Sequence, residues 1–369
     1  MKDFIELGLS QGVSKSLGEM GVKTPTDVQK EIIPLLLDKE VDLLAMAQTG
    51  SGKTLAYVTP IIDKIKANEG IQALVLVPTR ELAQQVKKVF FKSTKHIDKR
   101  LFVEAVYGGQ KIHDQEDRLK KPTQILVATP GRLLELLERN SLDIRNLKYL
   151  VLDEADEMIQ MGFRPDLNRL IRYMSDQKHV WLFSATLPDE LRAVIKKYLR
   201  PGYESFKADA KIRLNPNINH EFKELAPGNK MDYIIDQIDG MNGEQGIIFV
   251  RTKANAQKLA EELSEDGIAA KALEGNMGQR DRDKVMRGFK NGATQILVAT
   301  DVAARGLDIS DLNYIIHHQL PDQTVFYPHR SGRTARAGKK GLSLALVSPR
   351  ENHLLNEIEK TFQIKFKQR

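Results

Sequence analysis

Eight residues near the start of the chain have the composition of a loop that holds phosphate groups. They read Ala-Gln-Thr-Gly-Ser-Gly-Lys-Thr and follow the short apolar run 43–46. Glycines let backbone N–H groups turn toward phosphate oxygens, and a helix N-terminus behind the loop adds its dipole. Lysine in this position contacts the β and γ phosphates, and the last threonine places its hydroxyl on Mg²⁺. The pattern predicts a nucleoside triphosphate site made of Ala47, Gln48, Thr49, Gly50, Ser51, Gly52, Lys53 and Thr54.

Hydrolysis of a bound triphosphate also needs carboxylates, and the chain provides them after another apolar run. Residues 149–152 read Tyr-Leu-Val-Leu, and Asp153 and Glu154 come next. Asp153 is expected to hold Mg²⁺ partly through water, and Glu154 to orient and deprotonate the attacking water. A merely acidic helix start, which the helix dipole favours, is the competing interpretation. A phosphate loop in the same chain makes the catalytic interpretation the stronger one.

Two arginines in the second half of the chain are candidates for stabilising charge in the transition state. Arg333 and Arg336 are three residues apart, so they share one face if this segment is helical. On charge alone, a basic surface helix explains this spacing better. If the nucleotide binds one domain and the arginines belong to another, however, hydrolysis requires the two domains to close together. The sequence then predicts a nucleotide-gated clamp.

The elements that must position these residues follow an alternation of short apolar runs and amphipathic stretches, which is typical of βαβ units. The expected strands are residues 43–46, 73–77, 102–106, 125–128, 149–152, 180–183, 247–250, 269–273, 296–299, 314–317 and 344–347. A length of 369 residues suits two domains, and prolines with polar residues interrupt the pattern near the middle. We expect an α/β protein with domains at 1–203 and 219–369, joined by a flexible linker at 204–218.

One heptapeptide occurs twice in the chain. Thr-Gln-Ile-Leu-Val-Ala-Thr stands at residues 123–129 and again at 294–300, each time before a loop that contains glycine and arginine. Two similar buried strands explain the identity by chance. The alternative is two copies of one domain that present equivalent loops to a single linear ligand.

Composition excludes several classes of protein. Hydrophobic residues make up 41% and charged residues 28%, which argues against disorder, collagen and coiled coils. The absence of cysteine excludes disulfide frameworks, thiolate metal sites and cysteine nucleophiles. Lysine and arginine number 56 against 49 acidic residues, an excess of 56 − 49 = 7 that favours a polyanionic partner. With neither a membrane-spanning run nor a signal peptide, we expect a soluble cytoplasmic protein with no membrane partner.

Together these segments resemble the DEAD-box ATP-dependent RNA helicases, a family named after the tetrad at residues 153–156. Other segments match the family's motifs in order, namely 21–29 with Phe4 upstream, 78–83, 108–109, 129–132, 184–186, 248–250, Gln279 with Arg282, 299–308 and 329–338. The resemblance implies two tandem RecA-like domains, ATP and Mg²⁺ as cofactors, and RNA as the partner.

The resemblance also implies roles for single residues. Phe4 and Gln29 would belong to the nucleotide site, where Gln29 reads the adenine edge, and Asp308 would contact the ribose. Residues that couple the nucleotide to RNA would be Asp156, Ser184, Thr186 and His329. The RNA path would use Pro78, Thr79, Arg80, Gly108, Gly109, Thr129, Gly131, Arg132, Thr252, Gln279, Arg282, Thr300 and Gly306.

We therefore expect a monomeric, RNA-stimulated ATPase that binds single-stranded RNA and unwinds short duplexes locally. Contacts to phosphates carry no base information, so binding should tolerate any sequence and weaken with added salt. Two alternatives stay open: an ATP-gated RNA clamp or assembly platform with little unwinding, and a motor directed at DNA. Val22 stands where the family usually has an aromatic residue, so a smaller contact with adenine is expected.

Overall fold

The computed structural model divides the chain into two compact units, Met1–Ala210 and Lys211–Arg369. It describes residues 3–48, 50–176, 178–208, 214–275, 277–304, 309, 312–335 and 339–369, apart from the side chains of residues 227, 279 and 302. Each unit has its own sheet and its own apolar core, so each is described by itself.

The N-terminal unit contains a seven-stranded parallel sheet in the order β3-β4-β2-β5-β6-β1-β7. Its strands are β1 (Leu43–Met46), β2 (Ala73–Leu76), β3 (Val103–Val106), β4 (Ile125–Ala128), β5 (Tyr149–Leu152), β6 (His179–Ser184) and β7 (Glu204–Lys207). Its helices are α1 (Gln11–Glu19), α2 (Asp27–Asp38), α3 (Lys53–Lys64), α4 (Arg80–Ser93), α5 (Ile112–Leu119), α6 (Pro130–Glu138), α7 (Ala155–Gln160), α8 (Arg164–Leu170) and α9 (Asp189–Tyr198), with a 3₁₀ turn at Ile171–Tyr173.

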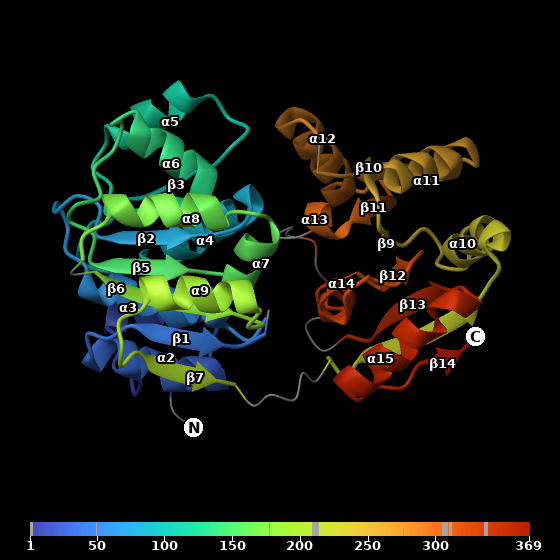
Figure 1. The fold of residues 1–369 in the computed structure, drawn as a ribbon, viewed down its shortest axis with the longest axis horizontal. Coiled ribbons are helices and arrows are strands. Elements are labelled where there is room, and N and C mark those ends of the chain that lie inside the picture. The colour runs from blue at the N-terminus through green and yellow to red at the C-terminus, as the bar shows by residue number, and fades with distance from the viewer. Residues whose placement is uncertain are drawn as a thin grey trace. The chain divides into compact units, whose positions relative to one another are not determined.

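Helices cover both faces of this sheet (Figure 1). The apolar sides of α1 to α4 pack on one face, and those of α6 to α9 pack on the other. The central strands β2 and β5 are therefore buried at every position, which explains why their sequences are continuous apolar runs rather than alternating ones. The loops that follow the strands at their carboxyl ends are left to carry polar residues.

The C-terminal unit contains a second seven-stranded parallel sheet, in the order β10-β11-β9-β12-β13-β8-β14. Its strands are β8 (Ile218–Glu224), β9 (Gly246–Val250), β10 (Ala270–Leu273), β11 (Ile296–Thr300), β12 (Tyr314–His317), β13 (Gly341–Val347) and β14 (Lys367–Gln368). Its helices are α10 (Lys230–Asp239), α11 (Lys253–Glu265), α12 (Gln279–Lys290), α13 (Asp301–Ala304), α14 (Tyr327–Ser331) and α15 (Asn352–Phe362), with 3₁₀ turns at Pro227–Asn229, Thr324–Phe326 and Pro349–Glu351.

The two sheets have the same strand order when their strands are compared position by position. β4 is the second strand of the first sheet, and β11 is the second strand of the other. These two strands carry the repeated heptapeptide, so Thr129 and Thr300 lie at equivalent strand ends. This agreement confirms the prediction of two α/β domains of one architecture.

Three edge or near-edge strands differ from the sequence-based expectation. β7 pairs with β1 and lies inside the linker expected at 204–218. β8 pairs with β13 and begins at the last residue of that linker. β14 pairs with β8 and is not among the expected strands. β7 and β14 are edge strands, and β8 lies next to β14. All three carry exposed or partly buried polar residues, and this removes the apolar run that identifies a central strand. The bounds of the linker stay a prediction.

The helices are short compared with a lipid bilayer. Within the described parts of the chain, no helix combines the length and the apolar character that crossing a membrane requires.

Candidate functional site

The phosphate loop joins β1 to α3 at the carboxyl edge of the first sheet. Gly52 is the N-cap of α3 and has a φ of 92°, in the left-handed region that favours glycine. Lys53 is buried and its Nζ donates to the carbonyl oxygen of Ala47 at 2.7 Å, which closes the loop on itself. The loop thus presents the N-terminus of a twelve-residue helix, the geometry that suits phosphate groups.

Gln29 is bound to this loop rather than exposed beside it. Its side chain is part of a capping box at the start of α2, where Oε1 accepts from the backbone N–H of Thr26 at 2.9 Å. Its Nε2 donates to the carbonyl oxygen of Gly52 at 3.0 Å, and Thr26 Oγ1 donates to the carbonyl of Ser51 at 2.8 Å. An amide can still offer one N–H and one lone pair after these bonds, the pair that an adenine edge needs. Phe4 lies instead in the apolar core.

The acidic tetrad follows β5 at the same edge of the sheet. Asp153 is only 3% exposed, and its Oδ1 accepts from the backbone N–H of Glu154 at 3.0 Å. Glu154 has a φ of 51°, an unusual value for a residue with a side chain and one that tends to persist where function requires it. The turn separates the two carboxylates, so that Asp153 is buried while Glu154 is only partly buried.

Tyr57 contacts Asp153 from one turn inside α3. Its hydroxyl donates to Asp153 Oδ2 at 2.7 Å, and both side chains are buried. Burial raises the pKa of Asp153, while the charge of Lys53 and the hydrogen bond from Tyr57 act in the opposite direction. Burial and the neighbouring carboxylate also raise the pKa of Tyr57, so its hydroxyl stays protonated as a donor.

Asp156 connects the tetrad to the end of β6. Its Oδ2 accepts from both the backbone N–H and the hydroxyl of Thr186, at 2.8 and 2.7 Å. Ser184 in turn donates from Oγ to the carbonyl oxygen of Thr186 at 2.7 Å. These three residues are therefore brought together as the resemblance implied, and their coupling role stays a prediction.

The expected RNA residues of the N-terminal unit meet around the loop after β3. Arg80 donates to the carbonyl of Gly108 at 3.4 Å, and Arg132 donates from Nη2 to the carbonyl of Gln110 at 3.0 Å. Arg132 also pairs with Glu135, while its Nη1 is buried without a hydrogen-bond partner among the described residues. An unsatisfied guanidinium N–H is suited to a phosphate oxygen. Pro78, Thr79, Thr129 and Gly131 lie at the starts of α4 and α6 beside them.

In the C-terminal unit, the expected RNA residues lie at helix starts that follow strands. Thr252 caps α11 by accepting from the backbone N–H of Asn255 at 3.2 Å. Arg282 is 7% exposed and donates to the carbonyl oxygen of Ala303 at 2.6 Å, so it holds α13. Thr300 ends β11 and is buried.

Arg333, the candidate for stabilising the transition state, is partly buried and donates to the carbonyl of His329 at 3.3 Å.

Four of the predicted residues lie outside the described parts of the chain, and they are Thr49, Gly306, Asp308 and Arg336. The backbone of Gln279 begins α12, but its side chain is outside the description. The roles of all five stay predictions.

Sequence reasoning missed three residues that hold the sites together. Tyr57 contacts Asp153, and its position three residues after Thr54 in one helix is a signal that was available. Gln115 is fully buried and bonds both backbone groups of Tyr107, just before the Gly108 loop. Arg330 is 1% exposed and forms a two-bond ion pair with Asp301 at 2.6 and 2.7 Å.

The oxygen donors near the phosphate loop fit Mg²⁺ when phosphates complete the shell. Thr54 offers a hydroxyl and Asp153 a carboxylate, the hard oxygen ligands that Mg²⁺ prefers. No group of three or more histidine, aspartate or glutamate side chains able to bind a metal occurs in the described residues.

Comparisons with known proteins agree with this geometry. Residues 26–194 match the family model of the DEAD/DEAH box helicases, and residues 229–338 match that of the helicase conserved C-terminal domain. The DEAD-box ATP-dependent RNA helicase CshA of Geobacillus kaustophilus is 42% identical over 98% of this chain and 77% of its own length. The protein of the same name in Bacillus cereus is 41% identical over 98% of this chain and 68% of its own.

Solved structures show the same fold. The S. cerevisiae protein Dbp5 bound to RNA and ADP BeF3 superposes with a TM-score of 0.90 at 28% identity, covering 100% of this chain and 96% of that one. Mss116 bound to ssRNA and UDP-BeF gives a TM-score of 0.87 at 28% identity, covering 100% and 80%. The fold is therefore two tandem RecA-like domains, and the chain belongs to the DEAD-box ATP-dependent RNA helicases.

Proposed function

We propose that the protein binds ATP and Mg²⁺ on its N-terminal unit and single-stranded RNA on both units, and that it separates short RNA duplexes locally. The observation that carries this proposal is the position of the acidic tetrad: Asp153 is bonded to Tyr57 of α3, the helix that the phosphate loop opens, and Asp156 is bonded to Thr186 after β6. In hydrolysis Glu154 would activate water and the phosphate loop would bind the triphosphate, while Thr54 and Asp153 would hold Mg²⁺, which would supply positive charge beside the phosphates.

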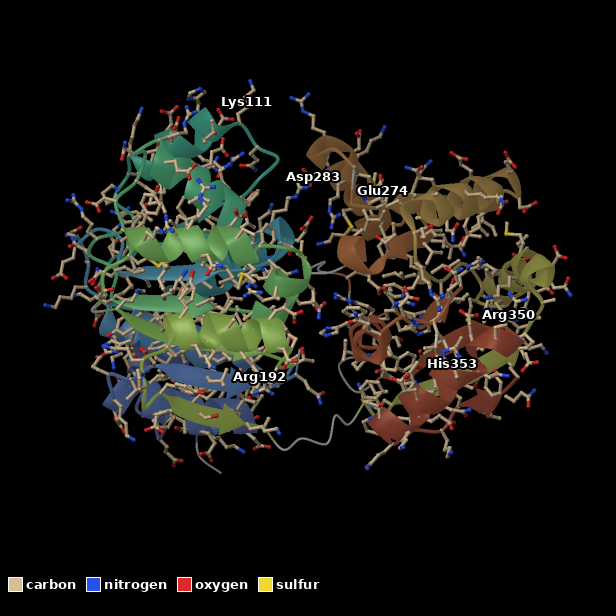
Figure 2. All side chains as sticks on the ribbon, viewed as in Figure 1. Lys111, Arg192, Glu274, Asp283, Arg350 and His353 are labelled. Atoms are coloured by element: carbon tan, nitrogen blue, oxygen red, sulfur yellow. The ribbon has the colours of Figure 1, made fainter. Side chains whose placement is uncertain are left out.

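RNA binding is proposed from the loops at the carboxyl ends of both sheets. Those loops carry Arg80, Arg132 and backbone amides next to exposed surface, for example around Lys111, which projects from the start of α5 (Figure 2). Dbp5 and Mss116, to which this chain is similar, are solved bound to RNA, which supports RNA as the ligand. Closure of the two units on ATP would bend the bound strand, so that a short duplex loses its partner strand locally.

The experiment that tests this function measures ATP hydrolysis and strand displacement with the full chain. RNA should stimulate hydrolysis more than DNA of the same sequence, and a short RNA duplex should separate with ATP. Glu154→Gln should bind ATP and RNA but turn over slowly, because it keeps the shape of the side chain and loses the base. Equal stimulation by DNA would favour the DNA motor. Tight ATP-dependent RNA binding without displacement would favour the clamp.

Arg333→Ala tests whether the second unit contributes to hydrolysis. If Arg333 acts as an arginine finger, the rate should fall by about 10³–10⁵-fold while ATP binding changes little. Arg350→Ala is the control, since Arg350 is an exposed arginine of the same unit (Figure 2). A change of less than about tenfold in Arg333→Ala would assign the residue a structural role only.

A further inference from the structure

Tyr57 places a polar group inside an apolar part of the N-terminal unit. The residue lies on α3, one turn after Lys53 and Thr54, and it is 0% exposed. Its ring packs against Phe183 of β6 with centroids 5.2 Å apart and planes tilted by 54°. The ring therefore has one position, and that position fixes where the hydroxyl lies.

The hydroxyl of Tyr57 contacts a side chain that the proposed function assigns to Mg²⁺. It donates its single hydrogen to Asp153 Oδ2 at 2.7 Å. A phenol has only one hydrogen, so this bond uses it. The hydroxyl of Tyr57 therefore acts on Asp153.

This contact decides how the carboxylate of Asp153 is turned. Asp153 has one hydrogen bond to each oxygen, from Tyr57 and from the backbone N–H of Glu154, so its carboxylate plane is fixed. Groups that orient a ligand in this way strengthen the binding of the metal they do not touch.

We propose that Tyr57 is a positioning residue that pre-orients Asp153 for Mg²⁺. The inference rests on the proposed function, since it takes Asp153 as a residue that holds the ion. A tyrosine that only filled the core would need the ring and not the hydroxyl. Tyr57→Phe separates these two roles, because phenylalanine keeps the ring and removes the connection.

The test measures binding of a fluorescent ATP analogue to the full chain as Mg²⁺ is titrated, with no need for turnover. Tyr57→Phe should raise the Mg²⁺ concentration for half-maximal tightening by about tenfold. Binding of the analogue without Mg²⁺ should stay unchanged. The matched control is Tyr198→Phe, which removes another buried hydroxyl of this unit, one that donates to the carbonyl of Leu167. Tyr198→Phe should leave the Mg²⁺ dependence as it is.

A third variant separates failure of this inference from failure of the proposed function. Asp153→Asn should lose most of the Mg²⁺ dependence. If it does and Tyr57→Phe does not shift the titration, Tyr57 is a core residue and the inference is wrong. If Asp153→Asn leaves the titration unchanged, the metal site itself is misassigned. Circular dichroism confirms that each variant is folded before the titration is interpreted, and Tyr57→Phe keeps the ring that the fold requires.

Discussion

At the residue scale, the phosphate loop depends on a position where only glycine fits. A Cβ on Gly52 would lie 2.5 Å from Gln29 Nε2 and 2.7 Å from Thr26 Oγ1. Both atoms belong to the bonds that join the capping box to the loop. A side chain here would displace Gln29 from the position in which its remaining N–H and lone pair are proposed to meet adenine.

Gly52→Ala is therefore expected to weaken ATP binding by about tenfold, a loss of about 1.4 kcal/mol. Its left-handed backbone should also lower the unfolding free energy by about 1–2 kcal/mol. Equilibrium binding of a fluorescent ATP analogue and chemical denaturation measure the two effects. Gly70→Ala is the control, since Gly70 has a φ of 71° and an added methyl group would meet no atom within 4 Å. The idea fails if both variants weaken ATP binding equally.

Sequence reasoning identified the residues whose type and spacing indicate their chemistry. Lys53 and Asp153 follow from the phosphate loop and the acidic tetrad. Tyr57 was not predicted, because its partner Asp153 is 96 residues away in sequence and the contact exists only once α3 packs beside β5. Arg282, which the resemblance assigns to the RNA path, is buried and bonded to the carbonyl oxygen of Ala303, a contact that its place in the sequence did not predict.

At the element scale, the central strands could be predicted from the sequence, whereas a polar edge strand could not. β2 and β5 could be predicted since they are buried at every position, whereas the polar strand β7 could not.

β3 is an edge strand that was predicted, and a glutamine side chain bonds the backbone just after its end. Gln115 of α5 accepts from the N–H of Tyr107 at 3.1 Å and donates to its carbonyl at 2.9 Å, as a neighbouring strand would.

Gln115→Ala should therefore loosen the Gly108 loop that follows. It removes two buried hydrogen bonds, so the unfolding free energy should fall by about 2 kcal/mol. Affinity for single-stranded RNA, measured by fluorescence anisotropy, should fall several-fold, while affinity for ATP stays the same. The comparison variant is His113→Ala on the same helix, where the side chain is exposed. Loss of ATP affinity together with RNA affinity would show that the effect is not confined to the loop.

At the scale of the whole molecule, the two units differ in the histidines through which acid can lower their stability. The C-terminal unit buries His220 and His317 and partly buries His318, and loss of hydration is the main cause that lowers the pKa of each. For His220 and His318 the pKa falls from 6.5 to about 4, with Lys230 adding to the effect at His318 and Glu351 opposing it. Arg330 adds to the effect at His317.

These shifts predict a loss of stability in mild acid. Below pH 6.5 the unfolded chain binds protons at these histidines, while the folded unit does not until about pH 4. Stability is therefore fully present above pH 6.5 and falls steadily between 6.5 and about 4. At pH 5, His220 and His318 should each cost about 2 kcal/mol relative to pH 7.5.

The measurement can be assigned to one unit because the chain has a single tryptophan, Trp181, buried in the N-terminal unit. Circular dichroism follows both units, while tryptophan fluorescence follows only the first. From pH 7.5 to pH 5, the dichroism transition of the C-terminal unit should move to lower denaturant, and the fluorescence transition should move less. In the N-terminal unit His179 is less deeply buried, and Glu40 at 3.1 Å opposes the lowering of its pKa.

His220→Asn should remove part of this pH dependence, about 2 kcal/mol between pH 7.5 and 5, whatever it does to stability at neutral pH. His353→Asn is the control, because His353 is an exposed histidine on α15 of the same unit (Figure 2). It should leave the pH dependence unchanged. Parallel movement of both transitions, or an equal effect of the two variants, would contradict the assignment of acid sensitivity to the buried histidines of the second sheet.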